Sequence, residues 1–317
     1  MNFIDRTNKL KFIDGKGNPI LVHFLNLIVN KMQFQYIKKV KVGKLNTDYR
    51  EEKLIVSLTT FPKRINAVTY SIKSIFNQTY IPDRVVLWLS GEQFDYTVPS
   101  ELENLIMNGL EVKFCDDLKS HKKYYYSLLN QKKDELVITI DDDLLYSEKL
   151  IENLVKKHEE NPNTIICTRA RTVCINNDEY EKYEKWKCYS DVGTKKPSFQ
   201  LMPSTGAGTL YPQNSLADVA FDKELIINLA LYTDDLWIKF VSTLNNTKII
   251  KISKEIRYLS NINIDDDERL LDRNVIENGN DISIAKLDKV FPIVKQKILE
   301  EIKRENINDN YKIERKE

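Results

Sequence analysis

The stretch "VITIDDDLLY" (residues 137–146) decides the fold, because an apolar, β-branched run ends in three consecutive acidic residues. An apolar run of this length predicts a buried strand, and Asp141, Asp142 and Asp143 follow at its carboxyl end. Carboxylates that lie this close repel one another, and burial removes part of their hydration. The pattern therefore predicts a compensating positive charge, and a divalent cation is the first candidate.

Strands and helices alternate on both sides of this stretch. Short apolar runs predict strands, and segments with apolar residues at helical spacing predict helices. The predicted strands span residues 53–62, 83–91, 110–117, 135–143 and 163–169, and the predicted helices span residues 65–78, 101–109, 119–131 and 147–162. Such alternation favours an α/β fold with a mostly parallel central sheet flanked by helices.

The texture of the chain divides it into three parts. Residues 1–50 form a partly helical N-terminal appendage, residues 51–260 the main α/β domain, and residues 261–317 a charged C-terminal helical region. Within the main domain, residues 169–200 are polar, aromatic and irregular. An irregular segment of this length inside a domain is usually a functional loop or lid.

Composition excludes several classes of protein. Lys and Arg number 48 and Asp and Glu 47, so the charge balance gives no case for a nucleic-acid partner. The four cysteines form no CxxC pair and the three histidines are widely spaced, which predicts reduced thiols in a cytoplasmic protein without a His-rich zinc site.

One apolar segment leaves two interpretations open. Residues 19–44 grade from apolar residues into lysines, and they are too short and too interrupted to span a bilayer. The segment is either an amphipathic helix packed on the main domain or a helix that lies on a membrane surface. The second interpretation would make the protein peripheral at the inner face of the membrane.

Polar residues gather at the predicted strand ends. Thr59–Thr60, Asp116–Asp117 and Asp141–Asp143 each follow a strand, and ligands bind at the carboxyl ends of strands in parallel sheets. Carboxylate oxygens are ligands for Mg²⁺ or Mn²⁺. We expect the first and third residues of the triplet to face the ligand, with Asp143 as the preferred metal ligand. The alternative is a solvated acidic turn before the next helix.

Other motifs have both functional and structural interpretations. Asp234–Asp235 open a predicted helix, where acidic residues also simply complement the helix dipole. Lys122–Lys123 stand at a helix start, which suggests a nearby anion or a plain lysine surface. The second triplet, Asp265–Asp267, is interpreted as the N-terminal turn of a late helix. The glycines of "STGAGTLYP" (residues 204–212) indicate a close backbone approach, a positive φ or a turn.

Taken together, five motifs resemble a known family. "IVSLTTFPKRI", "CDDLKSHKKYYYSL", "VITIDDDLLY", "STGAGTLYP" and "TDDLW" occur in the order seen in bacterial polysaccharide glycosyltransferases related to inverting family 2. The resemblance covers about residues 50–250 and implies the Rossmann-like, A-type nucleotide-sugar fold. Each motif is weak by itself, and the order and spacing make the set specific.

The resemblance implies a donor site at the strand ends. In that family an acidic element like the triplet holds Mn²⁺ or Mg²⁺, which bridges the diphosphate of the nucleotide-sugar donor. Asp141 and Asp143 inherit the metal-binding role by position. The residues for which donor contacts are implied are Thr59, Thr60, Arg64, Asp117, Lys122, Lys123, Asp141 and Asp142.

The resemblance also implies a catalytic base and a sugar pocket. The family's base belongs to an acidic pair that opens a helix, so Asp235 is the expected base and Asp234 its neighbour. Gly206, Gly208 and Trp237 are expected near the transferred sugar or the acceptor.

These expectations define a reaction. A sugar, most simply from a UDP-sugar, would pass to a saccharide or lipid-linked saccharide acceptor in the synthesis of surface polysaccharide or capsule, with inversion. Some relatives use a late histidine as a further metal ligand, but no histidine follows His158 here. Processive relatives carry transmembrane helices after the domain, and their absence in this sequence favours addition of a single sugar.

Three alternatives remain open. A sugar-1-phosphate nucleotidyltransferase shares the α/β nucleotide fold, but its usual Gly-rich phosphate loop is missing from "SLTTFPKRI" (residues 57–65). A catalytically inactive, partner-binding relative would not need the intact acidic motifs. A hydrolase with paired carboxylates would not need the triplet at a strand end.

Overall fold

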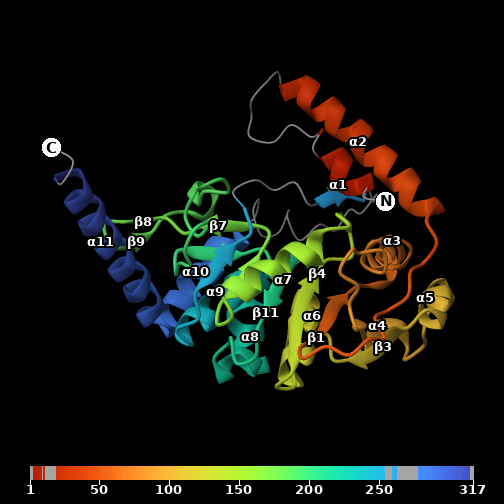
Figure 1. Cartoon of the computed structure of the whole chain (residues 1–317). Helices are drawn as coiled ribbons and strands as arrows, with labels where there is room; N and C mark the ends of the chain where they lie inside the picture. Colours follow the sequence, from red (N-terminus) through yellow and green to blue (C-terminus); the bar gives the residue numbers. More distant parts are fainter. Residues whose placement is uncertain (1–2, 9, 11–18, 254–258, 263–277, 315–317) are drawn as a thin grey trace.

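The computed structural model describes residues 3–8, 10, 19–253, 259–262 and 278–314. A seven-stranded sheet forms the centre of the molecule, in the order β12-β6-β11-β4-β1-β2-β3 (Figure 1). The strands of this sheet are β1 (Lys53–Thr59), β2 (Arg84–Ser90), β3 (Leu110–Cys115), β4 (Glu135–Ile140), β6 (Ile165–Cys167), β11 (Ala207–Tyr211) and β12 (Ile249–Lys251). β11 is antiparallel to β4 and β6, and the other pairs are parallel. The predicted fold class is therefore confirmed.

Helices cover both faces of this sheet. One face packs against α3 (Ile65–Ile75), α5 (Glu103–Met107) and α7 (Leu150–Glu160). The other face packs against α6 (Lys122–Leu129), α8 (Lys223–Ala230), α9 (Asp234–Leu244), α10 (Gly279–Val290) and α11 (Pro292–Glu314). The helices of the C-terminal region thus share the core of the main domain.

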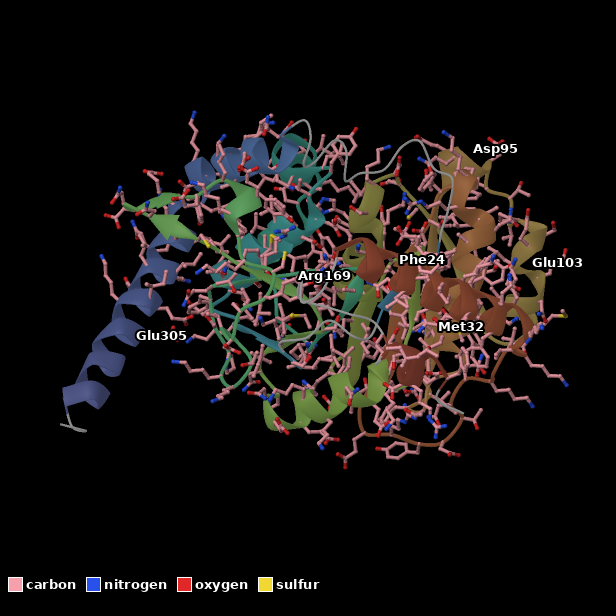
Figure 2. The ribbon with its side chains drawn as sticks, turned by 90° about the horizontal axis from the view of Figure 1, so that it is seen from above. Phe24, Met32, Asp95, Glu103, Arg169 and Glu305 are labelled. Atoms are coloured by element: carbon pink, nitrogen blue, oxygen red, sulfur yellow. The ribbon has the colours of Figure 1, made fainter. Side chains whose placement is uncertain are left out.

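The N-terminal residues form α1 (Phe3–Asn8) and α2 (Pro19–Lys39). They pack on α3 and on the short strands β5 (Leu144–Tyr146) and β13 (Leu259–Asn261), which pair with each other. The carboxylate of Glu148 accepts the backbone N–H groups of Ile4 and Asp5 at 2.9 Å each, which satisfies two of the free donors at the start of α1. In the view from above, Phe24 and Met32 lie along α2 (Figure 2).

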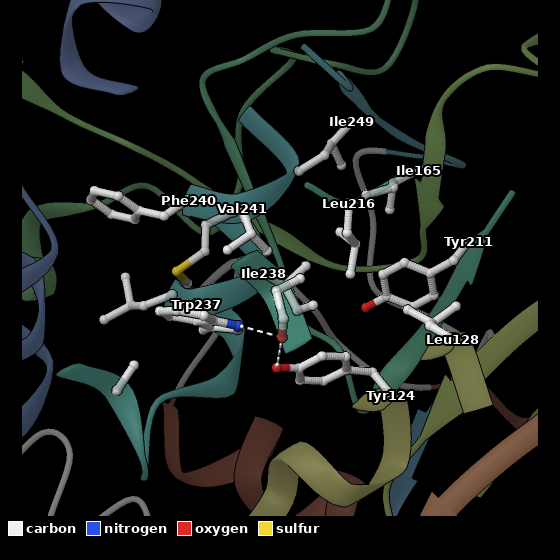
Figure 3. Close-up of a cluster of buried hydrophobic side chains, with 14 of the residues drawn as sticks. Tyr124, Leu128, Ile165, Tyr211, Leu216, Trp237, Ile238, Phe240, Val241 and Ile249 are labelled. Carbon is white, nitrogen blue, oxygen red and sulfur yellow. Dashed lines mark hydrogen bonds between the residues drawn. The ribbon is translucent and has the colours of Figure 1, made fainter. Parts of the chain in front are cut away.

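Alternation along the strands builds the two halves of the core. In β1, Leu54, Val56 and Leu58 point to the α3 side, and Ile55 points to the α6 side. Successive side chains of a strand point to opposite faces, so a strand buried on both faces needs a continuous apolar run. Figure 3 shows part of the α6 side, where side chains from the sheet meet α6 and α9.

The segment "STGAGTLYP" begins with the expected turn, at Thr205–Gly206, and continues as a strand. Its residues 207–211 form β11, which is fully buried in the middle of the sheet. Gly208 has a φ of +97°, and the pairing with β4 shifts register at this point. A glycine in a strand often marks such a bulge, and that is why its pattern resembles a loop.

The segment 169–200 has more structure than its irregular pattern suggests. It contains three short strands and ends directly before β10. These are β7 (Ala170–Thr172), β8 (Ile175–Asn176) and β9 (Glu179–Tyr180), with β7 pairing with β10 (Leu201–Pro203).

The second acidic triplet, Asp265–Asp267, lies outside the described residues. Within the described ranges, no helix has the length and the apolar character needed to cross a membrane.

The position of β11 generates a stability prediction. Leu210 is fully buried in this strand, so Leu210→Ala should lower the free energy of unfolding by about 2–5 kcal/mol, measured by urea titration. The exposed Leu129 at the end of α6 offers a control, and Leu129→Ala should change the value by less than about 0.5 kcal/mol. Equal effects of the two substitutions would contradict the placement of residues 207–211 in the core.

Candidate active site

The acidic triplet divides into an inner residue and two outer residues. Asp142 is 8% exposed and accepts from the Thr60 hydroxyl at 2.6 Å, whereas Asp141 and Asp143 are 40% and 35% exposed. Arg64 Nη1, at the start of α3, lies 3.0 Å from Asp142 Oδ1 and 3.1 Å from Asp143 Oδ2. The structure thus directs the first and third carboxylates outward and uses the second to hold the loop.

Lys123 lies between the triplet and the acidic pair of α9. Its Nζ is 2.7 Å from Asp141 Oδ1 and 3.0 Å from Asp234 Oδ2, and its side chain is only 4% exposed. Burial alone would lower the pKa of Lys123, but the charges of Asp141 and the acidic pair outweigh it and hold the pKa well above its usual value. One buried ammonium therefore connects two parts of the site that are more than 90 residues apart in sequence.

Thr205 holds the acidic pair in place. Its backbone N–H donates to Asp235 Oδ1 at 2.8 Å, and its hydroxyl lies 2.6 Å from Asp234 Oδ2 and 2.7 Å from Asp235 Oδ1. Ser120 donates to the other oxygen of Asp234 at 2.8 Å. A hydroxyl carries one hydrogen, so Thr205 can donate to only one of the two carboxylates at a time. The two acids therefore lie in different environments.

The pKa values of the pair move in opposite directions. Burial would raise the pKa of Asp234, but the charge of Lys123 outweighs it and holds that pKa well below its usual range. Burial, followed by repulsion from Asp234, raises the pKa of Asp235 to about 6. Two adjacent carboxylates whose environments separate their pKa values are a recurring feature of acid–base sites.

The two outer carboxylates are the candidate ligands of a divalent cation. Burial and the charges of Asp141 and Asp142 raise the pKa of Asp143 to about 6, and this is the imbalance that a cation would relieve. Among the residues that the structure describes, no group of three or more His, Cys, Asp or Glu side chains is arranged to hold a metal ion. Two carboxylates suffice for Mg²⁺, which commonly keeps waters and takes substrate phosphates as further ligands.

Gly206 closes the site beside Asp141. A Cβ built on this glycine would lie 1.7 Å from Asp141 Oδ2, so no other residue fits without displacing the carboxylate. The backbone N–H of Asp141 donates to the Gly206 carbonyl at 3.0 Å, and the Tyr146 hydroxyl donates to the same carbonyl at 2.6 Å. The close approach that the glycine pattern predicts is therefore an approach to the triplet.

Asp117 and Lys122 form a second charged group at the end of β3. Lys122 Nζ lies 2.6 Å from Asp117 Oδ1, and Gln93 and Lys119 bind the other oxygen. Burial opposes ionisation of Asp117, but the hydrogen bonds from Lys119 and Lys122 outweigh it and lower its pKa to about 2. Adjacent lysines of α6 thus neutralise different carboxylates, Lys122 at β3 and Lys123 at β4.

Three predicted site residues have their contacts outside the triplet and the acidic pair. Thr59 donates its hydroxyl to the Trp88 carbonyl at 2.8 Å, and Gly208 packs toward Leu150 of α7. Trp237, expected in the sugar pocket, lies instead in the hydrophobic core, where it is fully buried and donates to the Ala220 carbonyl at 3.2 Å (Figure 3). Residues two apart on a helix do not share a face, so Trp237 points away from Asp235.

Several residues that complete the cluster give no signal in the sequence. Thr205, Ser120 and Tyr146 have no distinctive local pattern, and only their tertiary contacts place them at the site. Thr233 stands before α9, but its hydroxyl contacts the Ala230 carbonyl and makes no cap bond to the helix. The acidic pair therefore starts α9 without a side-chain cap from Thr233.

One residue of the segment 169–200, Tyr183, is affected by the charge of the acidic pair. Burial, then the charge of Asp235, raises the pKa of Tyr183 to about 12, so this phenol lies within electrostatic range of the acidic pair. The Arg171 guanidinium lies over the Tyr183 ring, 4.7 Å from its centroid, and donates to the Trp186 carbonyl at 3.1 Å. The cation and the aromatic ring of this segment therefore pack on each other.

Comparisons with solved structures find distant similarities. The mannosyltransferase PcManGT from Pyrobaculum calidifontis, in complex with GDP-Man and Mn²⁺, is 12% identical, with 80% of this chain and 67% of that chain covered and a TM-score of 0.39. TarS residues 1–349 from S. aureus, in complex with UDP-GlcNAc, are 14% identical, with coverages of 65% and 57% and a TM-score of 0.42. The 4-diphosphocytidyl-2C-methyl-D-erythritolsynthase from Anaerococcus prevotii DSM 20548 is 12% identical, with coverages of 72% and 97% and a TM-score of 0.42.

A comparison with curated protein sequences finds no match. The sequence profile of glycosyl transferase family 2, in contrast, matches residues 59–220, which is more than half of the chain. The matched region runs from the end of β1 through the triplet and β11, and it includes Lys123 and Thr205. The chain therefore belongs to glycosyl transferase family 2.

Proposed function

We propose that the protein is a metal-dependent, inverting glycosyltransferase that moves a hexose from a UDP-sugar to a saccharide or lipid-linked saccharide acceptor. Its setting would be the synthesis of bacterial surface polysaccharide, such as capsule, at the cytoplasmic face of the membrane. One observation carries the proposal: Lys123 binds Asp141 of the triplet and Asp234 of the acidic pair, which brings the two motifs together.

The donor side of the site is built on the triplet. Asp141 and Asp143 would hold Mn²⁺ or Mg²⁺ through their outward carboxylates. When bound, the ion supplies Lewis-acid stabilisation of the charge that grows on the departing nucleoside diphosphate. Arg64 and Thr60 fix Asp142, and Asp142 thereby sets the direction in which its two neighbours point.

The base side of the site is built on α9. The pKa of Asp235 is about 6, so its carboxylate is mostly ionised at neutral pH. A pKa this close to neutral pH also makes the carboxylate an effective proton acceptor. Asp234 stays ionised because Lys123 and Ser120 bind it, and its charge keeps the pKa of Asp235 raised. Asp235 is thus the proposed catalytic base and Asp234 a positioning residue.

The proposed reaction is a single displacement. The acceptor hydroxyl oxygen attacks the anomeric carbon while the bond from that carbon to the phosphate oxygen breaks. The bonding electron pair leaves with the nucleoside diphosphate, and the hydroxyl proton moves to the Asp235 carboxylate. Attack on the face opposite the leaving group inverts the anomeric configuration. The segment with Tyr183 and Arg171 would border the acceptor.

The donor site can be tested without an acceptor. Asp143→Asn removes one of the two outward carboxylates, so Mn²⁺-dependent affinity for UDP should fall by at least ~10-fold, measured by isothermal titration calorimetry with and without Mn²⁺. Asp218→Asn, at an exposed position, is the matched control and should bind like the wild type. An affinity for UDP that is the same with and without Mn²⁺, or the absence of UDP binding in both conditions, would contradict the proposed function.

The base can be tested by turnover. Asp235→Asn keeps the shape of the side chain but cannot take the proton, so kcat should fall by about 10²–10⁴-fold. The measurement is UDP release from a UDP-sugar in the presence of membrane lipid extract as the source of acceptor. Mn²⁺-dependent UDP binding should persist in this variant, which separates loss of chemistry from loss of the fold. A kcat close to that of the wild type would exclude Asp235 as the base.

The acidic pair also predicts a pH dependence. Because Asp235 must be ionised, kcat/KM should be level above a pH of about 6 and fall tenfold per unit below it. Asp234→Asn removes the negative charge beside Asp235. Without this repulsion the pKa of Asp235 is lower, so the acid limb, which is the fall of kcat/KM at low pH, should move to lower pH. The test is the pH profile of kcat/KM for both proteins between pH 4.5 and 8. An acid limb that stays in place would show that Asp234 does not tune the base.

A further inference from the structure

Helix α2 exposes a continuous apolar stripe. Phe24, Leu27, Ile28 and Met32 follow one another at helical spacing, and between 40% and 58% of each is exposed. Residues three or four apart on a helix are neighbours on one face. We call these four residues the α2 stripe. Contiguous exposed apolar residues of this kind mark an interaction surface more often than scattered ones do.

The opposite face of α2 is fixed to the rest of the protein. Val29, Gln33 and Ile37 are buried there, and Ile37 packs in a cluster with Ala67 of α3 and Leu145 of β5. The Gln33 amide also donates to Thr7 Oγ1 at 2.6 Å and to Asn8 Oδ1 at 2.9 Å. These contacts set the rotation of α2 about its axis, so the α2 stripe faces outward as part of the folded structure.

The charged side chains of α2 and of the segment that follows it have one sign. The chain contains no Asp or Glu between Pro19 and Thr47, although acidic and basic residues are almost equal in number overall. Five lysines lie in this interval and all are exposed: Lys31, Lys38, Lys39, Lys41 and Lys44. An apolar stripe that continues into a basic end complements a surface that is apolar within and anionic at its boundary, which is a membrane of acidic lipids.

Helix α2 packs on elements that adjoin the candidate active site. α3 begins directly after Arg64, and β5 directly follows the triplet, so the residues on which α2 packs adjoin the donor side. In Figure 1, α2 lies along the upper edge of the molecule and α8 at the lower edge. Figure 2, seen from above, shows Phe24 and Met32 along the same helix.

We propose that α2 docks the protein on an anionic membrane surface, with the α2 stripe among the lipid headgroups and acyl boundary and the lysines against acidic headgroups. The docked helix would hold the site next to the membrane, where a lipid-linked acceptor is presented. Only this last step rests on the proposed function, because docking itself requires no catalysis.

The test is co-sedimentation of the full chain with vesicles of phosphatidylcholine alone or with one quarter phosphatidylglycerol. The wild type should bind the anionic vesicles at 0.1 M NaCl and be released at 0.5 M NaCl. Phe24→Ser/Met32→Ser and Lys38→Glu/Lys39→Glu should each weaken binding by ~10-fold or more. Ile227→Ser, which removes an exposed apolar side chain from α8, is the matched control and should bind like the wild type.

Two outcomes would overturn the docking proposal. One is failure of the wild type to sediment with anionic vesicles. The other is a dimer, detected by light scattering, that Phe24→Ser/Met32→Ser dissolves, because the α2 stripe would then be an interface between copies of the chain. Mn²⁺-dependent UDP binding by the same variants reports on the fold and on the donor site. If the wild type shows no Mn²⁺-dependent UDP binding, the proposed function is contradicted and the docking proposal is not.

Discussion

Lys123 carries its charge between two carboxylates that belong to distant parts of the chain. Asp141 lies at the end of β4 and the buried Asp234 at the start of α9, and without the ammonium these two groups of like charge would face each other. Arg64 likewise lies between two carboxylates, those of the adjacent residues Asp142 and Asp143. Two fixed cations, Lys123 and Arg64, therefore offset the charges of the triplet and of Asp234.

This balance depends on the central sheet. The parallel strands β1 and β4 bring Thr60 and the triplet to one edge, and the antiparallel β11 brings Thr205 and Gly206 to the same edge from the other direction. The absence of a side chain at Gly206 lets that backbone lie against Asp141, while Thr205 reaches the acidic pair. A single turn before β11 thus contacts both halves of the site.

Helix α2 packs near the edge of the sheet that carries the candidate active site. The loop after the triplet leads into β5, and β5, α3 and α2 share a small core cluster. A helix that packs directly behind the donor site, with its apolar side chains and lysines turned outward, connects the orientation of the site to whatever surface the helix contacts. Helices α1 and α2 thus pack on the main domain, although their sequence pattern differs from it.

The sequence by itself determined the alternation of strands and helices and the polar residues at the strand ends, because apolar β-branched runs and helical spacing are local signals. It also marked the triplet, the acidic pair and the glycines of residues 204–212. Tertiary structure alone decided that Lys123 is a buried bridge, that Trp237 belongs to the core and that β11 is a central strand. The physical reason is that a lysine at a helix start or a glycine in a short run looks the same in sequence whether it faces water or a carboxylate. Burial and pairing are properties of segments far apart in the chain, and only the folded sheet brings them together.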